Sequence, residues 1–170
     1  MNARQYQHPA GSAPLDCRHV RCHQSPWLTA EQQRIWRSCL AGVARIDSHL
    51  NLALAEFGLD LNEYEILVTL SESDDHSLRM SDLAQRVYQS RSRLTHTAKR
   101  MEEQGLLRRE RANDDRRGVV ASLTDEGMAL LVEAAPTHVR SVRDILIDVA
   151  TPDDLRALGR VMGAVLEVAD

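Results

Sequence analysis

Two cysteines near the N-terminus, Cys17 and Cys22, are the residues whose types and spacing most directly suggest chemistry. Arginine and histidine side chains surround them, and nearby cations lower the pKa of a thiol and favour its reactive thiolate. Two thiols with four residues between them could form a disulfide, which is the chemistry of an oxidation sensor. A Cys/His cluster could also bind a metal, but four ligands within seven residues are hard to arrange as a tetrahedron. Three interpretations stay open, namely that these cysteines have no role, that they sense oxidation, or that they bind a metal. No metal site is predicted.

Basic residues form a second group, between Arg86 and Arg117. This stretch holds ten arginines and lysines and five acids, so it carries +5, whereas the rest of the chain carries −9. The net charge of −4 therefore conceals a basic segment inside an acidic protein. Such a segment can be the electrostatic footprint of a DNA site, although a solvated charged helix would have the same composition.

A helix predicted from Ser90 to Gln104 has two different faces when it is wound at about 100° per residue. Its apolar face contains Leu94, Ala98 and Met101, joined by Thr97 and Ser90, and Arg93 and Arg100 lie on a flank of the opposite face. Its other face is basic and rich in hydroxyls, as suits a helix in the major groove, where such side chains contact base edges and phosphates. An ordinary amphipathic surface helix is the alternative. The candidate DNA-binding residues on this helix are Ser90, Arg91, Ser92, Arg93, Thr95, His96 and Lys99.

A polar turn follows this helix and contains Arg116 and Arg117. Arginines at the tip of a thin hairpin can enter a narrow, strongly negative minor groove. Asp115 could hold one of these arginines in place through a charge-assisted hydrogen bond. A solvated turn without such a role is the alternative.

The elements that must position these residues follow from caps and periodicity. Ser81 is expected to cap a short helix over residues 82–87, which a tight turn separates from the helix that begins after Ser90. Two short strands then flank the polar turn, with residues 119–123 as the second, so that a β-hairpin "wing" follows the helix-turn-helix. An extended segment at Leu78 and Met80 precedes the first helix of the pair.

Long helices are predicted at both ends of this unit. Thr29 opens one with a Thr-x-x-Gln capping box, and the helix runs to about Phe57 and stops at Gly58. Thr124 caps a helix to about residue 148, interrupted and bent by Pro136, and Thr151 caps the last helix. A small domain would struggle to cover the first helix, which favours a partner helix from a second subunit. Cys39, on its apolar face, is expected to be buried.

Length and composition agree with one compact domain and an arm. The chain has 170 residues, and polar residues 1–28 are expected to form a flexible N-terminal arm. No apolar run could span a bilayer and no signal peptide is evident, so a cytoplasmic protein without membrane partners is expected. Neither a phosphate-binding glycine loop nor a nucleophile elbow is present, so no catalytic residue, enzyme activity or cofactor is predicted. The predicted fold is mainly α, with a small β-hairpin wing.

The segment from Arg111 to Gly127 resembles the wing signature of the MarR (multiple antibiotic resistance regulator) family of bacterial transcription regulators. That signature is Asp-x-Arg, a hydrophobic strand, and Leu-Thr-x-x-Gly. Upstream, residues 80–84 resemble the family's first helix-turn-helix segment, and residues 94–107 resemble its recognition helix and exit. The resemblance covers about residues 29–170, and its wing positions are occupied by Asp115, Arg117, Leu123, Thr124 and Gly127.

This resemblance implies a winged helix-turn-helix protein that binds a palindromic double-stranded DNA operator as a homodimer, mostly as a repressor. The DNA-binding lobe would span about 60–124, and the dimerisation helices about 29–57 and 125–170. Arg117, with or without Arg116, would enter the minor groove. The resemblance also implies base or phosphate contacts by the exposed residues of the recognition helix, which are Ser92, Arg93, Thr95, His96 and Lys99.

The sequence does not determine which signal acts on such a regulator. The resemblance implies release from DNA by a small phenolic or lipophilic effector, or by an oxidant. One alternative is a thiol-based redox regulator that uses Cys17 and Cys22. Another is a helical dimerisation protein that does not bind DNA, which would leave the basic wing unexplained.

Overall fold

A computed structural model of the chain describes residues 27–112 and 118–168. The chain divides into two compact units, with the boundary between Cys39 and Leu40. The described part of the first unit ends in the N-terminal turns of α1 (Ala30–Leu54). The second unit contains the remainder of α1 and all the other elements, and it holds the helix-turn-helix and the hairpin.

Helix α1 begins as its capping box predicts. The Thr29 hydroxyl accepts a hydrogen bond from the Gln32 N–H at 3.1 Å, and the Gln32 side chain accepts one from the Thr29 N–H at 2.9 Å. The α-helix ends at Leu54, and one 3-10 turn, η1 (Ala55–Phe57), completes the predicted length. Gly58 then adopts a φ of 70°, a conformation that glycine reaches without strain and that ends many helices.

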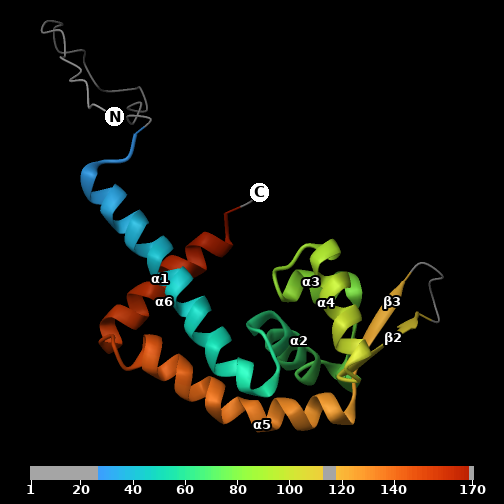
Figure 1. The fold of residues 1–170 in the computed structure, drawn as a ribbon. Helices are drawn as coiled ribbons and strands as arrows, with labels where there is room; N and C mark the ends of the chain where they lie inside the picture. Colours follow the sequence, from blue (N-terminus) through green and yellow to red (C-terminus); the bar gives the residue numbers. More distant parts are fainter. Residues whose placement is uncertain (1–26, 113–117, 169–170) are drawn as a thin grey trace, which may run out of the picture. The chain divides into compact units, whose positions relative to one another are not determined.

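The second unit is built around α2 (Leu61–Ser71), which packs against α5 (Asp125–Val142), the sheet and the helix-turn-helix (Figure 1). Leu67 and Leu70 of α2 are fully buried, as are Leu83 of α3 and Leu94 of α4. The other elements are η2 (Asp74–His76), β1 (Ser77–Arg79), α3 (Met80–Arg86), α4 (Arg91–Glu103), β2 (Leu107–Arg111), β3 (Val119–Leu123), the π-helical turn η3 (Arg143–Ile147) and α6 (Pro152–Leu166).

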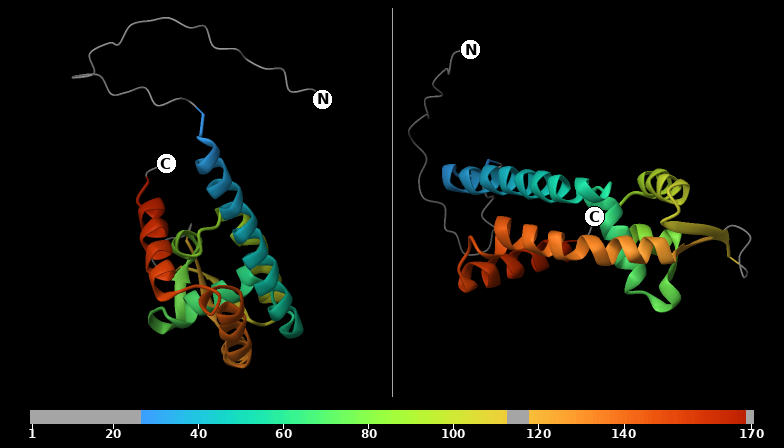
Figure 2. Two further views of the ribbon diagram at one scale, coloured as in Figure 1. Left: turned by 90° about the vertical axis from the view of Figure 1, so that its left-hand side faces the viewer. Right: turned by 60° about the horizontal axis from the view of Figure 1, so that its bottom comes forward.

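The sheet has three antiparallel strands in the order β1-β3-β2. The predicted hairpin is confirmed, since β2 and β3 pair from Leu107 opposite Leu123 to Arg111 opposite Val119. The extended segment predicted at Leu78 and Met80 is confirmed at Leu78, which lies in β1 and pairs with Ala121 of β3, and it is wrong at Met80, which begins α3. The hairpin projects from one end of α5, while α6 follows the other end (Figure 2).

The predicted start of the first helix of the helix-turn-helix was wrong by two residues. Helix α3 begins at Met80 with Arg79 as its N-cap, and Ser81 lies inside the first turn, where its hydroxyl donates to the Asp82 carboxylate at 3.0 Å. Pairing with β3 holds β1 extended as far as Arg79, so the helix starts directly after the strand. The strand, and not a side-chain cap, sets this boundary.

Helix α5 differs from the expectation at its proline. Thr124 caps it as predicted, but the helix continues through Pro136 to Val142 without interruption. Leu131 and Ala134 are buried just before the proline, and this packing keeps the helix in place although proline offers no N–H donor. The π-helical turn η3 follows, and the predicted Thr151 cap of α6 is confirmed, with Asp154 completing a capping box.

His138 of α5 makes the stability of this core depend on pH. Its ring lies 4.2 Å from that of Tyr64, and its Nδ1 atom is buried without a hydrogen-bond partner among the described residues. Burial lowers the pKa of His138 from its ordinary 6.5, so the unfolded chain takes up this proton at a higher pH than the folded one. The unfolding free energy should therefore fall as pH drops below 6.5, towards the pKa of the folded state.

We expect the His138→Phe variant to lack this part of the pH dependence. Thermal unfolding of both proteins between about pH 7.5 and 5.5 measures it, because phenylalanine keeps the ring and cannot titrate. The wild-type unfolding temperature should drop more steeply towards low pH than that of the variant. Parallel curves would contradict the assignment to His138.

Candidate nucleic-acid interface

Helix α4 presents the residues that its periodicity predicts. Ser90 is its N-cap and accepts a hydrogen bond from the Arg93 N–H at 3.3 Å. Leu94, Ala98 and Met101 are fully buried, and Thr97 is buried beside them. Ser90 is exposed, although the helical wheel placed it with the apolar face. All seven residues of this helix that were predicted to bind DNA are exposed and form what we call the α4 surface, namely Ser90, Arg91, Ser92, Arg93, Thr95, His96 and Lys99.

Hydrogen bonds within α4 leave most of this surface able to bind an external partner. The Thr95 hydroxyl donates to the Arg91 carbonyl at 2.7 Å, so its oxygen faces a partner as an acceptor only. Lys99 lies 3.7 Å from Glu103 in a pair whose side chains are both 66% exposed. Such an exposed ion pair contributes little to stability, so Lys99 can leave Glu103 and bind another anion. The α4 surface can thus offer cations and hydroxyl oxygens to a phosphate backbone or to base edges.

Arg100 is not part of this surface, although the helical wheel placed it on the same flank as Arg93. Its Nε lies 2.8 Å from Glu63, whose side chain is 4% exposed, and its guanidinium also contacts Asp60 at 2.9 Å. The hydrogen bond that Arg100 donates to Glu63, followed by the negative charge of Glu63, raises the pKa of Arg100. Asp60 and Glu63 are also the two members of the α2 capping box. Arg100 therefore fastens α4 to the start of α2.

The cluster of Arg100, Asp60 and Glu63 was not predicted, although the sequence contains part of its pattern. A helix over about residues 62–71 follows from the apolar spacing, and the Asp-x-x-Glu spacing at residues 60–63 matches a capping box at its start. Nothing in the sequence indicates that Arg100, 37 residues after Glu63, closes the same site.

A second ion pair joins α4 to the wing. Arg109 of β2 donates to Glu102 from its Nε at 3.0 Å and from its guanidinium terminus at 2.6 Å. The Arg109 N–H donates to the other carboxylate oxygen at 2.8 Å. The Arg109 side chain, followed by this backbone hydrogen bond, lowers the pKa of Glu102. Three donors on one carboxylate set the angle between the recognition helix and the hairpin.

We expect Glu102→Gln to weaken DNA binding although it removes a negative charge from the recognition helix. The glutamine amide has one acceptor oxygen where the carboxylate has two, so it cannot accept from both the Arg109 side chain and the Arg109 N–H. The angle between α4 and the wing is then no longer fixed. Affinity for a DNA duplex should fall by about 3- to 10-fold in fluorescence anisotropy. Glu103→Gln is the matched control, because among the described residues Glu103 pairs only with the exposed Lys99. Loss of this pair should leave DNA affinity equal or higher. Tighter binding by Glu102→Gln would refute the positioning role.

Several predicted site residues lie outside the described residues. These are the wing-tip residues Asp115, Arg116 and Arg117, and the cysteines Cys17 and Cys22. The expectation that Cys39 is buried was wrong, because Cys39 is exposed on α1. Trp36 on the same helix is 54% exposed.

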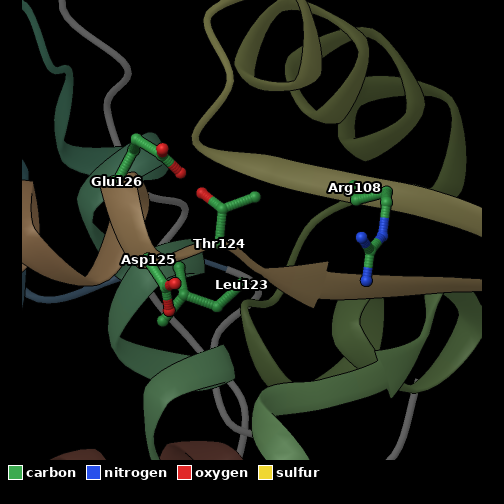
Figure 3. Close-up of a pocket in the computed structure, with 5 residues that line it drawn as sticks. All are labelled: Arg108, Leu123, Thr124, Asp125 and Glu126. Carbon is green, nitrogen blue, oxygen red and sulfur yellow. The ribbon is translucent and has the colours of Figure 1, made fainter.

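A small pocket of about 260 Å³ lies where the hairpin meets α5 (Figure 3). Arg108, Leu123, Thr124, Asp125 and Glu126 line it, and four of these five side chains are charged or polar. The Arg108 Nε is paired with Glu110 at 2.9 Å. This lining does not suit the phenolic or lipophilic effector that the family resemblance implies.

Other site classes find no support in residues 27–112 and 118–168. Within these ranges, no three His, Cys, Asp or Glu side chains are grouped as ligands of a metal ion. No helix in the same ranges combines the length and the apolar character that crossing a membrane requires.

Comparison with known proteins agrees with this geometry. A family model described as "MarR family" matches residues 57–118, which contain α2, the helix-turn-helix and β2. The chain is 36% identical over 120 residues to the HTH-type transcriptional regulator PecS of Dickeya dadantii, a match that covers 68% of this chain and 72% of PecS.

Two solved structures from Streptomyces coelicolor are also similar. One is the MarR family transcriptional regulator AbsC, with 44% identity and a TM-score of 0.80 over 84% of this chain and 97% of AbsC. The other is the MarR family transcriptional regulator Sco3205, solved in complex with DNA, with 40% identity and a TM-score of 0.82. That match covers 85% of this chain and 91% of Sco3205.

Proposed function

Because this chain belongs to the MarR family of transcriptional regulators, which are not enzymes, we propose that it binds a palindromic operator as a homodimer and represses transcription. The α4 surface is the observation that carries this proposal. It places Arg91, Arg93 and Lys99 around exposed hydroxyls on a helix whose opposite side is fully buried. A helix with this pattern fits the major groove of DNA. That Sco3205 was solved in complex with DNA supports the same assignment.

The wing supplies the second part of the proposed DNA contact. The Glu102–Arg109 ion pair aims the β2–β3 hairpin, whose tip carries Arg116 and Arg117 in the sequence. Arg117 enters the minor groove in this proposal, and Asp115 orients it. DNA contacts by the α4 surface and by the tip together would fix the lobe on the duplex.

Helix α6 supports a dimer. The part of the chain that the structure describes buries none of its residues, and Val161, Val165 and Leu166 are each more than half exposed. Apolar side chains left uncovered along a whole helix indicate a protein partner. A second copy of the chain, contributing its own terminal helices, is the partner we propose.

Binding to DNA from upstream of the protein's own gene tests the proposal. Fluorescence anisotropy at several salt concentrations should show tight binding that weakens steeply with salt, because phosphate contacts release counterions. The comparison duplex has the same length and a mixed sequence. Equal affinity for both duplexes would contradict an operator at this position, and salt-insensitive or absent binding to both would contradict the function itself.

Arg93→Ala should lower operator affinity by about tenfold or more without unfolding the protein, because Arg93 is exposed on the α4 surface. Arg140→Ala removes an equally exposed arginine from α5 and is the matched control. Identical binding curves for Arg93→Ala and Arg140→Ala would remove Arg93 from the site.

The releasing signal completes the proposal. Either a small phenolic or lipophilic molecule binds the protein and makes it release the operator, or an oxidant does so through Cys17 and Cys22. Peroxide treatment followed by a thiol reductant separates the two in the same assay. Loss and recovery of binding in the wild type, but not in Cys17→Ser, would support the oxidant. Binding that is indifferent to peroxide would support the small molecule.

A further inference from the structure

Tyr88, in the turn between α3 and α4, combines an exposed side chain with a strained backbone, and neither feature stabilises the fold. Its side chain is 80% exposed, more than any other large apolar or aromatic side chain among the described residues. Its φ is 51°, in the left-handed region. A bulky residue there is strained, since its Cβ crowds the backbone, whereas glycine adopts the same φ freely. Strain at an exposed position suggests a function outside the chain.

The residues on both sides hold Tyr88 in place. Val87 packs against the core. The Gln89 N–H donates to the Ala84 carbonyl at 2.9 Å, and its side chain donates to Asn62 of α2 at 3.3 Å. The Tyr88 N–H itself donates to the Gln85 carbonyl at 3.3 Å. The turn is therefore anchored, while the Tyr88 hydroxyl makes no hydrogen bond to any residue that the structure describes.

The place of Tyr88 in the motif identifies what its hydroxyl can reach. Tyr88 precedes Ser90, the N-cap of α4, by two residues. In helix-turn-helix docking, the first helix crosses the DNA backbone while the start of the second enters the major groove. The turn that joins them therefore faces the sugar-phosphate chain. A tyrosine hydroxyl is a good donor to a phosphate oxygen.

We propose that the Tyr88 hydroxyl donates a hydrogen bond to a phosphodiester oxygen of bound DNA. This inference rests on the proposed function, and it adds a residue that lies outside both the α4 surface and the wing. A phosphate contact carries no base preference, so Tyr88 positions α4 on the duplex and does not read sequence. The contact is neutral on the protein side, so it should release no counterion.

Two variants test the contact in the anisotropy assay, with duplexes from upstream of the gene and of mixed sequence. Tyr88→Phe keeps the ring and backbone and should weaken binding to both duplexes by about 3- to 10-fold per subunit. The slope of log affinity against log salt should stay at the wild-type value. Tyr88→Gly should weaken binding at least as much, while its unfolding temperature stays equal to that of the wild type or rises.

Asp75→Gly is the matched control, because Asp75 is an exposed residue with a φ of 52° that lies outside the helix-turn-helix. It relieves the same strain, and the loss of its negative charge cannot weaken DNA binding. Wild-type affinity in Tyr88→Phe would overturn the hydrogen bond, even if Tyr88→Gly bound weakly. A clear drop in the unfolding temperature of Tyr88→Gly would overturn it too, since Tyr88 would then serve packing. If the wild type bound neither duplex, the proposed function would fail and this contact with it.

Discussion

Gly127→Ala is expected to destabilise the protein by about 3 kcal/mol, because the added methyl group has no space. An ideal Cβ at Gly127 would lie 2.1 Å from the Leu106 carbonyl oxygen and 2.8 Å from Leu123 Cδ1. The closest atom belongs to the backbone, so no side-chain rotation can relieve the contact. The first turn of α5 would have to move away from the segment that joins α4 to β2.

Thermal unfolding followed by circular dichroism measures this effect. For a chain of this length, about 3 kcal/mol corresponds to an unfolding temperature about 6–12 °C lower. Glu126→Ala is the control, since Glu126 lies in the same turn, is exposed, and loses atoms instead of gaining them. Its loss should cost under about 1 kcal/mol. An unfolding temperature for Gly127→Ala within about 2 °C of wild type would show that α5 relaxes at little cost.

Arg100→Met is expected to lower stability by about 2 kcal/mol and to weaken DNA binding with it. The substitution keeps the aliphatic stem and removes the guanidinium, which leaves the buried Glu63 carboxylate without its charged partner. Removing one member of a fully buried pair costs more, but Arg100 is half exposed and the Asp60 N–H still donates to Glu63 at 3.0 Å. Helix α4 also loses its attachment to the start of α2.

The Glu63→Gln substitution, added to Arg100→Met, should restore part of the lost stability. A neutral amide is less costly to bury than an unpaired carboxylate, and its oxygen can still accept from the Asp60 N–H. Urea unfolding of the four proteins of this double-mutant cycle gives the coupling free energy. Lys99→Met is the neighbouring control, and it should weaken DNA binding while stability stays within about 0.5 kcal/mol. No stability loss in Arg100→Met would show that solvent replaces the ion pair.

Much of the interface could be predicted because it depends on neighbours in the sequence. The α4 surface follows from helical periodicity, with Leu94, Ala98 and Met101 buried and the basic residues opposite them. The Ser90 and Thr124 caps are equally local, since each accepts a hydrogen bond from the N–H three residues later. Side chains within one or two turns must meet whatever the rest of the chain does. The two short strands around the polar turn predicted the hairpin in the same local way, and the family resemblance agreed with it.

Contacts between distant segments could not be predicted in this way. Arg100 was assigned to the exposed flank because its helical angle is compatible with solvent, yet its long side chain reaches Glu63 and Asp60. The start of α3 shifted because pairing with β3, some 40 residues later, holds Arg79 extended. Cys39 lies on an apolar stripe, yet its side chain is exposed, because an apolar stripe shows that a side chain can be buried and not that a neighbour covers it.

By itself, the sequence determined the type and order of the elements, the caps, the basic side of α4 and the family, because these depend on short-range spacing. Only the tertiary structure decided which ion pairs aim the recognition helix and the wing, why residue 127 must be glycine, and that Tyr88 is strained and exposed. Those features arise where residues 7 to 40 positions apart in the sequence come together, or where a backbone angle departs from its usual range. A one-dimensional pattern contains neither distance nor angle.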